Sequence, residues 1–285
     1  MPQSLSVCII TYNEEANLGR TLASVAELVK RTAGEIIVVD SGSTDKTVEI
    51  AKSFGAKLFI EPWKGYAAQK NSAIDKAMGD WILLLDADEE VSPDLRAATA
   101  MVCAVPHERI FQLYVSKDGE VGAKDLPQVL PADAYWVPRA NFFLGRFIKF
   151  GGFWPDWKVR LFRRGRGRVG DRAVHETIIP TGTTAQLRGC CLLHHAYPTL
   201  QSYIGHMNKY STLGAEMVVS EKPRGFSLWN IVVRPWATFI YNYFFRLGFL
   251  DGREGLLLHM YHALYVSWKY AKAWEFSRKK SGQKR

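Results

Sequence analysis

Near-continuous apolar runs alternate with helical patterns over the first hundred residues. Residues 5–11, 35–39 and 81–85 have the composition of buried strands, and residues 57–60 form a shorter one. The segments between them carry apolar residues at helical spacing, including a helix over residues 65–77. Strands that are apolar throughout are typical of a parallel sheet with helices on both faces. The pattern therefore predicts an α/β fold.

Each of the three long apolar runs ends in polar residues. The first leads into Thr11-Tyr12-Asn13-Glu14-Glu15, the second into Asp40-Ser41-Gly42-Ser43, and the third into Asp86-Ala87-Asp88-Glu89-Glu90. In open α/β sheets, ligands bind beyond the carboxyl ends of the strands, so these segments should meet at one cleft. Carboxylates gathered there repel one another unless a cation joins them. Asp86 and Asp88 therefore suggest a site where Mg²⁺ or Mn²⁺ clamps a diphosphate.

The pattern changes after about residue 127. Residues 135–139, 157–162 and 187–195 are expected as strands, and the remainder of the chain is expected to be helical over 200–220, 228–249 and 254–279. We therefore expect one α/β domain over residues 1–198, made of a first half (about 1–100) and a second half (about 101–198). Residues 199–285 form a helical region that we expect at a membrane interface.

The C-terminal stretches are rich in aromatic residues but do not suit a membrane span. Residues 226–250 contain Arg234, Pro235 and Arg246, whereas a span needs about 20 predominantly apolar residues. One interpretation is an amphipathic pair of helices packed on the domain. The other is a helix lying in the plane of the membrane interface, which suits Trp and Tyr mixed with Arg and Lys.

Charge is distributed unevenly along the chain, whose formal net charge is +9. Residues 1–100 carry a net of −5 and residues 101–285 a net of +14. The basic part must face an anionic substrate, a nucleic acid or an acidic membrane. Six arginines lie close together in sequence: Arg160, Arg163, Arg164, Arg166, Arg168 and Arg172. They form either a solvated loop or a site for an anionic acceptor, since arginine binds phosphate in a bidentate manner.

The four cysteines show no disulfide framework, and no signal peptide precedes the first strand. We therefore expect a reducing, cytosolic location. The run Cys190-Cys191-x-x-His194-His195 does not suit a structural zinc site, because adjacent strand residues point to opposite faces.

The strand-end motifs, together with Gln69-Lys70-Asn71 and Trp81, closely resemble family 2 glycosyltransferases of the GT-A fold. Residues 153–164, Val174-His175-Glu176 and the tail from Arg234-Pro235 to Gly255 resemble a branch that contains β-1,4-glucosyltransferases of the lipopolysaccharide core. The resemblance implies a mixed GT-A sheet with helices on both faces, with a nucleotide-sugar half over about residues 1–100 and an acceptor half over about residues 101–198. It also implies an inverting, metal-dependent transfer of a hexose, glucose from UDP-glucose, to a lipopolysaccharide or lipooligosaccharide core acceptor. The enzyme would act as a peripheral protein at the inner face of the cytoplasmic membrane.

The resemblance assigns expected roles to individual residues. The nucleotide sugar would contact Thr11, Tyr12, Asn13, Glu14, Asp40, Gly42, Ser43, Lys70 and Asp86. The metal would be held by Asp88 and Asp86, with His195 as a further ligand, and Asp88 would also be catalytic. An anionic glycolipid acceptor would contact Trp154, Asp156, Arg160, Arg163 and His175.

Several of these residues also have purely structural interpretations. Asn13 could cap a helix, Asp40 could cap a turn into Ser41-Gly42-Ser43, and Lys70 could be a solvated charge. The base that deprotonates the acceptor could be Asp171, His175 or Glu176, and the resemblance favours Glu176.

Other activities fit less well. Nucleotidyltransferases usually begin with a glycine-rich loop, and this chain has no glycine before Gly19. Transfer to a polyprenyl phosphate is the nearest rival and needs no base, because that acceptor is already ionised. A nucleic-acid- or membrane-binding protein without catalysis is the alternative of a different class, and we expect no nucleic acid partner.

Overall fold

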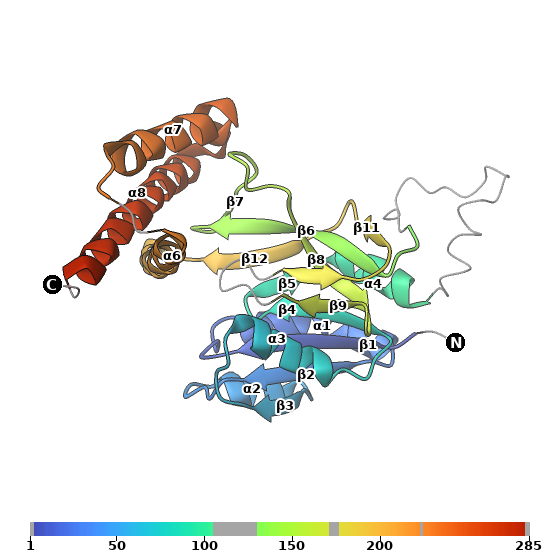
Figure 1. Cartoon of the computed structure of the whole chain (residues 1–285). Coiled ribbons are helices and arrows are strands. Elements are labelled where there is room, and N and C mark those ends of the chain that lie inside the picture. The colour runs from blue at the N-terminus through green and yellow to red at the C-terminus, as the bar shows by residue number, and fades with distance from the viewer. Residues whose placement is uncertain (1–2, 105–129, 171–176, 223–224, 283–285) are drawn as a thin grey trace. The chain divides into compact units, whose positions relative to one another are not determined.

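The computed structural model describes residues 3–104, 130–170, 177–222 and 225–282. The chain forms two compact units (Figure 1). The N-terminal unit contains Met1–Arg139 and Asp156–His194, and the C-terminal unit contains Ala140–Pro155 and His195–Arg285. The predicted division at residue 198 stays a prediction, and the segment Ala140–Pro155 is grouped with the C-terminal helices.

Four parallel strands form the first part of the sheet in the N-terminal unit. They are β1 (Leu5–Thr11), β2 (Glu35–Asp40), β3 (Lys57–Ile60) and β4 (Trp81–Asp86). Their order is β3-β2-β1-β4, and all seven residues of β1 are buried. A strand buried on both faces needs no polar alternation, which explains its continuous apolar composition.

Helices cover both faces of this sheet, as predicted. Alternate β1 residues point to opposite faces. Leu5, Val7 and Ile9 pack in one core with α1 (Leu18–Arg31) and α4 (Pro93–Ala104). Cys8 and Ile10 pack in a second core with α3 (Tyr66–Asp75). The short helix α2 (Thr47–Ser53) joins β2 to β3.

The sheet continues through strands of mixed direction, in the order β4-β8-β6-β12-β5. Strand β8 (Asp156–Arg163) is antiparallel to β4 and β6 (Ala134–Phe143), and β12 (Leu192–Tyr197) is antiparallel to β5 (Glu89–Val91). Strand β11 (Thr184–Gln186) pairs with β6, while β9 (Gly167–Val169) and β10 (Ile178–Pro180) form a separate ribbon. The parallel arrangement predicted from the first hundred residues holds for β1 to β4, and the sheet as a whole is mixed, as the family resemblance implies.

The C-terminal unit is mainly helical. It contains α6 (Leu200–Glu221), α7 (Arg234–Ile240) and α8 (Gly252–Gly282), with β7 (Arg146–Phe147) paired to the end of β6. Phe143, Ile148, Tyr203 and Leu258 form a core that joins the strand segment to the helices. Buried Asp251 strengthens this connection by accepting hydrogen bonds from the backbone N–H groups of residues 149 and 150.

The helix predicted over residues 228–249 is not one regular α-helix. Two π-helical turns, η1 (Trp229–Val233) and η2 (Tyr241–Phe245), flank α7, and a 3₁₀ turn, η3 (Gly248–Asp251), leads into α8. In the part of the chain that the structure describes, no helix is both long enough and apolar enough to cross a membrane.

Candidate active site

The polar ends of the first, second and fourth strands lie side by side, as the sequence predicts. Thr11 is opposite Asp40 in the β1–β2 ladder, and Ile10 is opposite Asp86 in the β1–β4 ladder. Parallel strands end at the same edge of a sheet, so the three motifs share one edge. This edge is the candidate active site.

Reciprocal hydrogen bonds join the loops that follow β1 and β2. The Asn13 N–H donates to Ser43 Oγ at 2.8 Å, and the Thr44 N–H donates to Asn13 Oδ1 at 2.9 Å. Asn13 has a φ of 53°, a left-handed conformation that asparagine tolerates better than most residues. The Asn13 side chain therefore bridges the loops instead of capping α1. Tyr12 beside it is 58% exposed and available to a ligand.

Asp40 organises the second loop. Its buried carboxylate accepts hydrogen bonds from the Thr11 hydroxyl, from the backbone N–H groups of Gly42 and Ser43, and from the Ser43 hydroxyl. Gly42 has a φ of 89°, which favours glycine at this position. The structure thus shows the turn-capping role of Asp40, while a contact between Asp40 and a nucleotide stays a prediction.

Asp86 at the end of β4 lies between two cations. Lys70 Nζ lies 2.6 Å from Asp86 Oδ1, and Arg160 Nη2 lies 2.6 Å from Oδ2. Burial alone would raise the pKa of Asp86, but Arg160 and Lys70 reverse this effect and hold its pKa well below the usual range. Asp86 is therefore ionised, and Lys70 is a buried partner of Asp86 instead of a solvated charge.

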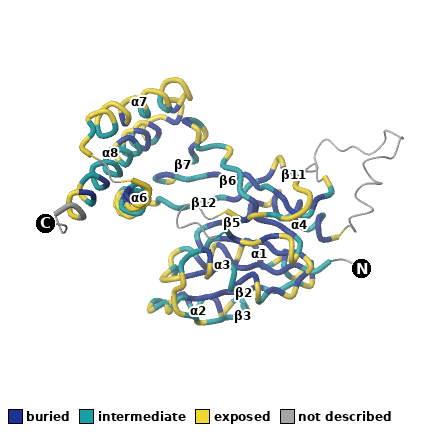
Figure 2. Tube along the Cα trace, viewed as in Figure 1, coloured by how far each residue is buried: buried dark blue, intermediate teal, exposed yellow. Residues whose placement is uncertain are grey.

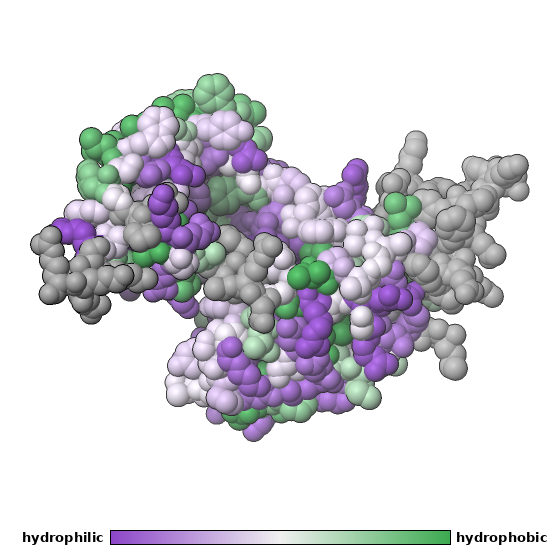
Figure 3. Space-filling model, viewed as in Figure 1, coloured by the Kyte–Doolittle hydropathy of each residue, from purple (hydrophilic) through white to green (hydrophobic). Residues whose placement is uncertain are grey.

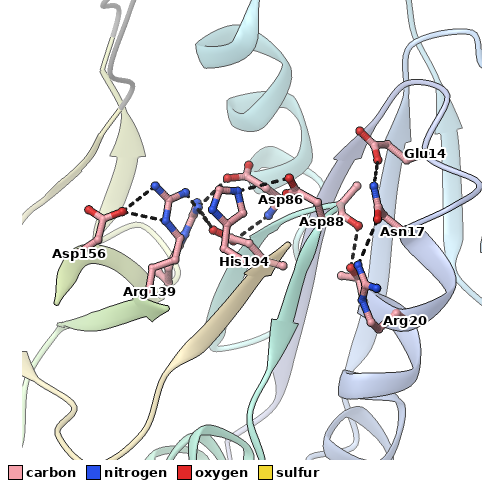
Figure 4. A network of polar contacts seen from close by, with 12 residues as sticks. Glu14, Asn17, Arg20, Asp86, Asp88, Arg139, Asp156 and His194 are labelled. Atoms are coloured by element: carbon pink, nitrogen blue, oxygen red, sulfur yellow. Dashed lines mark hydrogen bonds and ion pairs between the residues drawn. The ribbon is translucent and has the colours of Figure 1, made fainter. Parts of the chain in front are cut away.

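The ionic network continues through Glu89 and Arg139 to Asp156, of which only Asp156 has a role expected from the sequence; Figure 4 shows Arg139 beside Asp156. Glu89, fully buried, lies 2.6 Å from Arg160 Nη2 and 3.4 Å from Arg139 Nη1. Arg139 also contacts Asp156 at 2.7 Å. Alternating charges thus run from Lys70 to Asp156, so each buried carboxylate in the network has a basic partner.

Asp88 contacts a histidine of β12. Its Oδ2 lies 3.3 Å from His194 Nε2 (Figure 4). Burial would raise the pKa of Asp88, but His194 and Arg139 together outweigh this effect, and the pKa lies below its ordinary value. The predicted ligand His195 belongs to the C-terminal unit and stacks on Phe142 with a centroid distance of 4.7 Å.

Glu14 is the fourth carboxyl group near this edge. Its Oε2 accepts a hydrogen bond from Asn17 Nδ2 at 2.9 Å, and Asn17 in turn accepts from Arg20 (Figure 4). Burial, with added repulsion from Asp88 and nearby carboxylates, raises the pKa of Glu14. Its ionisation is thus sensitive to any cation bound close by.

The predicted acceptor residues occupy different places. Arg160 and Asp156 lie in the ionic network, whereas Arg163 lies opposite Trp81, the first residue of β4. Arg163 is therefore at the other end of that strand from Asp86. Trp154 belongs to the C-terminal unit and packs against Phe147. Asp171, Arg172, His175 and Glu176 lie outside the described residues.

The side chains at this edge can be compared with the predicted metal site. Among the described residues, no three or more His, Cys, Asp or Glu side chains are grouped to hold a metal. Both oxygens of Asp86 are engaged by Lys70 and Arg160, and the next carboxylate along the chain, Asp88, lies beside His194. Mg²⁺ commonly binds one or two carboxylates and completes its shell with phosphates and water. This pair therefore suits a cation that binds together with a diphosphate.

The sequence placed Glu89 in the third strand-end cluster without giving it a role, and it missed Arg139 and His194 as site residues. Arg139 carries a charge within the largely apolar strand β6, which is a signal of burial with a partner, whereas Glu89 begins the three-residue strand β5 and gives no such signal. Strand alternation predicted that His194 and His195 point to opposite faces, but not which of them contacts Asp88.

Comparison with known proteins identifies the family. The profile described as Glycosyl transferase family 2 matches residues 6–164. The chain belongs to glycosyltransferase family 2. It is therefore an enzyme, as predicted, and not a binding protein without catalysis.

Relatives of this family 2 glycosyltransferase match it over different lengths. The lipopolysaccharide core biosynthesis glycosyltransferase LpsC of Rhizobium meliloti is 31% identical over 95% of this chain and 92% of that protein. An uncharacterized glycosyltransferase of Rickettsia bellii is 44% identical, over 41% of this chain and 38% of its own length.

A solved structure supports the fold. The mannosyltransferase PcManGT of Pyrobaculum calidifontis, in complex with GDP-Man and Mn²⁺, has a TM-score of 0.53 and 13% identity. The match covers 96% of this chain and 87% of that one. This likeness concerns the fold alone, and it confirms the predicted GT-A-like mixed sheet with helices.

Proposed function

We propose that this glycosyltransferase moves a hexose from a UDP-sugar, with inversion, to a saccharide of a lipopolysaccharide core. The assignment of a nucleotide-sugar donor is supported by one observation: the three strand-end motifs, including the one with Asp86 and Asp88, lie at one edge of the sheet. The acceptor class is supported by the similarity to LpsC along nearly the whole chain. Glucose as the sugar rests on the family resemblance alone.

The nucleotide would bind at the two joined loops. Tyr12 offers an exposed ring to a base, and the loop held by Asn13 and Asp40 presents a fixed surface to the ribose. Asp40, Gly42 and Ser43 would act mainly by fixing the loop, because their hydrogen bonds are made within it. Pre-ordered loops reduce the entropy cost of binding the donor.

Asp88 and His194 would hold Mg²⁺ or Mn²⁺ when the diphosphate binds. Such a cation supplies positive charge to the oxygens of the leaving diphosphate. Lys70 and Arg160 keep Asp86 ionised and fixed, and Lys70 has further N–H donors for a phosphate oxygen. Predicted coordination by Asp86 or His195 would require different side-chain positions.

The acceptor hydroxyl must lose its proton as the sugar is transferred. We assign this step to Glu176, with His175 as a neighbouring acceptor contact, on the family resemblance. An anionic glycolipid acceptor of this kind would place the enzyme at the inner face of the cytoplasmic membrane. Trp154 and Asp156 remain candidate contacts for that saccharide.

Thermal unfolding with UDP, GDP or CMP, each with and without Mn²⁺, tests the donor site. A ligand at about 100 times its dissociation constant adds roughly 2.7 kcal/mol to the free energy of unfolding. We expect stabilisation by UDP that needs Mn²⁺ and is lost in Asp88→Asn but retained in Asp94→Asn, a control at an exposed position of α4. No shift with any nucleotide would refute the donor assignment.

Transfer assays with Glu176→Gln test the base. We expect loss of transfer with the UDP-dependent stabilisation intact. Undiminished turnover would contradict the assignment and favour an acceptor that is already ionised, such as a polyprenyl phosphate.

A further inference from the structure

The C-terminal unit exposes a dense set of large apolar side chains over residues 225–250, here called the aromatic segment. Leu228, Trp229, Trp236, Tyr241, Phe244 and Phe245 are each more than half exposed, and Phe245 reaches 76%. Figure 2 shows α7 largely exposed, and Figure 3 shows hydrophobic residues gathered over it. Patches of this kind on a folded protein mark a surface that contacts a partner or a membrane.

The exposure does not arise from a loosely held segment. On its other side Pro235 is buried, and the Ser267 hydroxyl of α8 donates to the Ile231 carbonyl at 2.7 Å. Arg234 Nη1 donates to the Tyr270 hydroxyl of α8, and the Gly151 N–H donates to the Arg246 carbonyl at 2.9 Å. One side of the aromatic segment is thus fixed within the unit, while the other presents aromatic rings outward.

Charge indicates what covers this surface. Residues 225–250 contain Arg234 and Arg246 but no Asp or Glu. The sequence of the C-terminal unit carries 15 Lys/Arg against 5 Asp/Glu, a net of +10, whereas the N-terminal unit carries a net of −1. The excess of positive charge therefore belongs to the unit with the exposed aromatic rings. A second copy would bring two such units together and add repulsion, whereas an anionic lipid surface would attract them.

We propose that the aromatic segment docks in the headgroup region of an anionic bilayer. Trp and Tyr favour the boundary between headgroups and acyl chains, and arginine side chains there can reach lipid phosphates. The described helices do not span a membrane, which agrees with a segment lying in the interface plane. The proposal rests on this surface and is independent of the sugar, the nucleotide and the acceptor.

Vesicle flotation with the full chain tests the proposal. The vesicles contain phosphatidylethanolamine with or without phosphatidylglycerol, and the variant is Trp236→Glu/Phe245→Glu. The control is Trp63→Glu, which changes a half-exposed tryptophan of the N-terminal unit. We expect binding that requires phosphatidylglycerol and falls by about tenfold or more in the double variant but not in the control.

Two further measurements keep the test decisive if the double variant folds poorly. Brominated lipids should quench part of the wild-type tryptophan fluorescence, and Trp229→Phe/Trp236→Phe should remove that part. Equal vesicle binding by a folded double variant would overturn the proposal. A second result would also overturn it: the wild type is a dimer in solution, the double variant is a monomer, and neither binds lipid. The aromatic segment would then be covered by a second copy of the chain.

Discussion

Arg160 and Glu89 form a buried ion pair, with Arg160 Nη2 2.6 Å from Glu89 Oε1. Glu89 is inaccessible to solvent, and only 7% of the Arg160 side chain is exposed. The same guanidinium contacts Asp86, so one arginine joins the end of β4 to β5. The position of Asp86 thus depends on a pair of residues beneath the edge of the site.

Replacing Glu89 should destabilise the fold more than replacing its neighbour. Glu89→Gln leaves Arg160 and Arg139 buried with one negative charge fewer beside them. Breaking a buried ion pair in this way should lower the free energy of unfolding by about 3–5 kcal/mol. Glu90→Gln is the matched control, because Glu90 is partly exposed and lies 3.8 Å from Arg20. Glu90→Gln should lower the free energy of unfolding, measured with urea, by no more than about 1 kcal/mol. Equal effects of the two changes would show that the network does not stabilise the fold.

The two adjacent histidines should differ in their effect on metal binding. His194→Asn should weaken Mn²⁺ binding in the presence of UDP by about tenfold, because His194 contacts Asp88. His195→Asn removes a ring stacked on Phe142 and should reduce stability instead. Calorimetric titration of Mn²⁺ measures the first effect and thermal unfolding the second. The reverse pattern would favour the ligand that the sequence predicted.

Arg160 and Arg163 provide a comparison within one strand. Arg160→Gln should abolish transfer, because it removes a partner of Asp86 and Glu89. Arg163 lies over the ring of Trp81, with its guanidinium carbon 4.8 Å from the ring centroid, at the other end of β4. Arg163→Gln should therefore cost about 0.5–1 kcal/mol of stability with little change in kcat/KM. A marked rise in KM for the saccharide would instead support the predicted acceptor contact.

His259 should make stability depend on pH. Burial, with the nearby His262, lowers the pKa of His259 to about 4, and among the described residues neither ring nitrogen has a hydrogen-bond partner. The unfolded chain takes up this proton near its ordinary pKa of about 6.5, so stability falls as the pH decreases from 6.5 to 4. The loss should be roughly 3 kcal/mol and level off below pH 4.

His259→Leu removes the titrating group at similar volume and should flatten this part of the stability–pH curve. His206→Leu, at a half-buried position of α6, is the control. Urea unfolding at several pH values supplies the comparison. An unchanged slope in His259→Leu would assign the pH dependence to other groups.

The sequence was most informative where neighbouring residues form a recognisable pattern of apolar and polar positions. Apolar runs without alternation predicted β1, β2 and β4, and polar residues at their ends predicted one shared edge, which the strand register confirms. The short strands β5 and β11 were not predicted, because three residues carry too little periodicity. The π-helical turns around α7 also leave no distinct sequence signal.

By itself, the sequence determined the α/β class, the family and the strand-end motifs. The periodicity of apolar residues and the spacing of motif residues are local properties of a chain, so they can be recognised without the structure. Only the tertiary structure decided the partners of those motifs. It placed Lys70 and Arg160 on Asp86, His194 on Asp88, and Arg163 at the opposite end of the strand. Residues far apart in the chain meet through strand order and register, and a buried charge is stabilised by whichever partner that packing brings within reach.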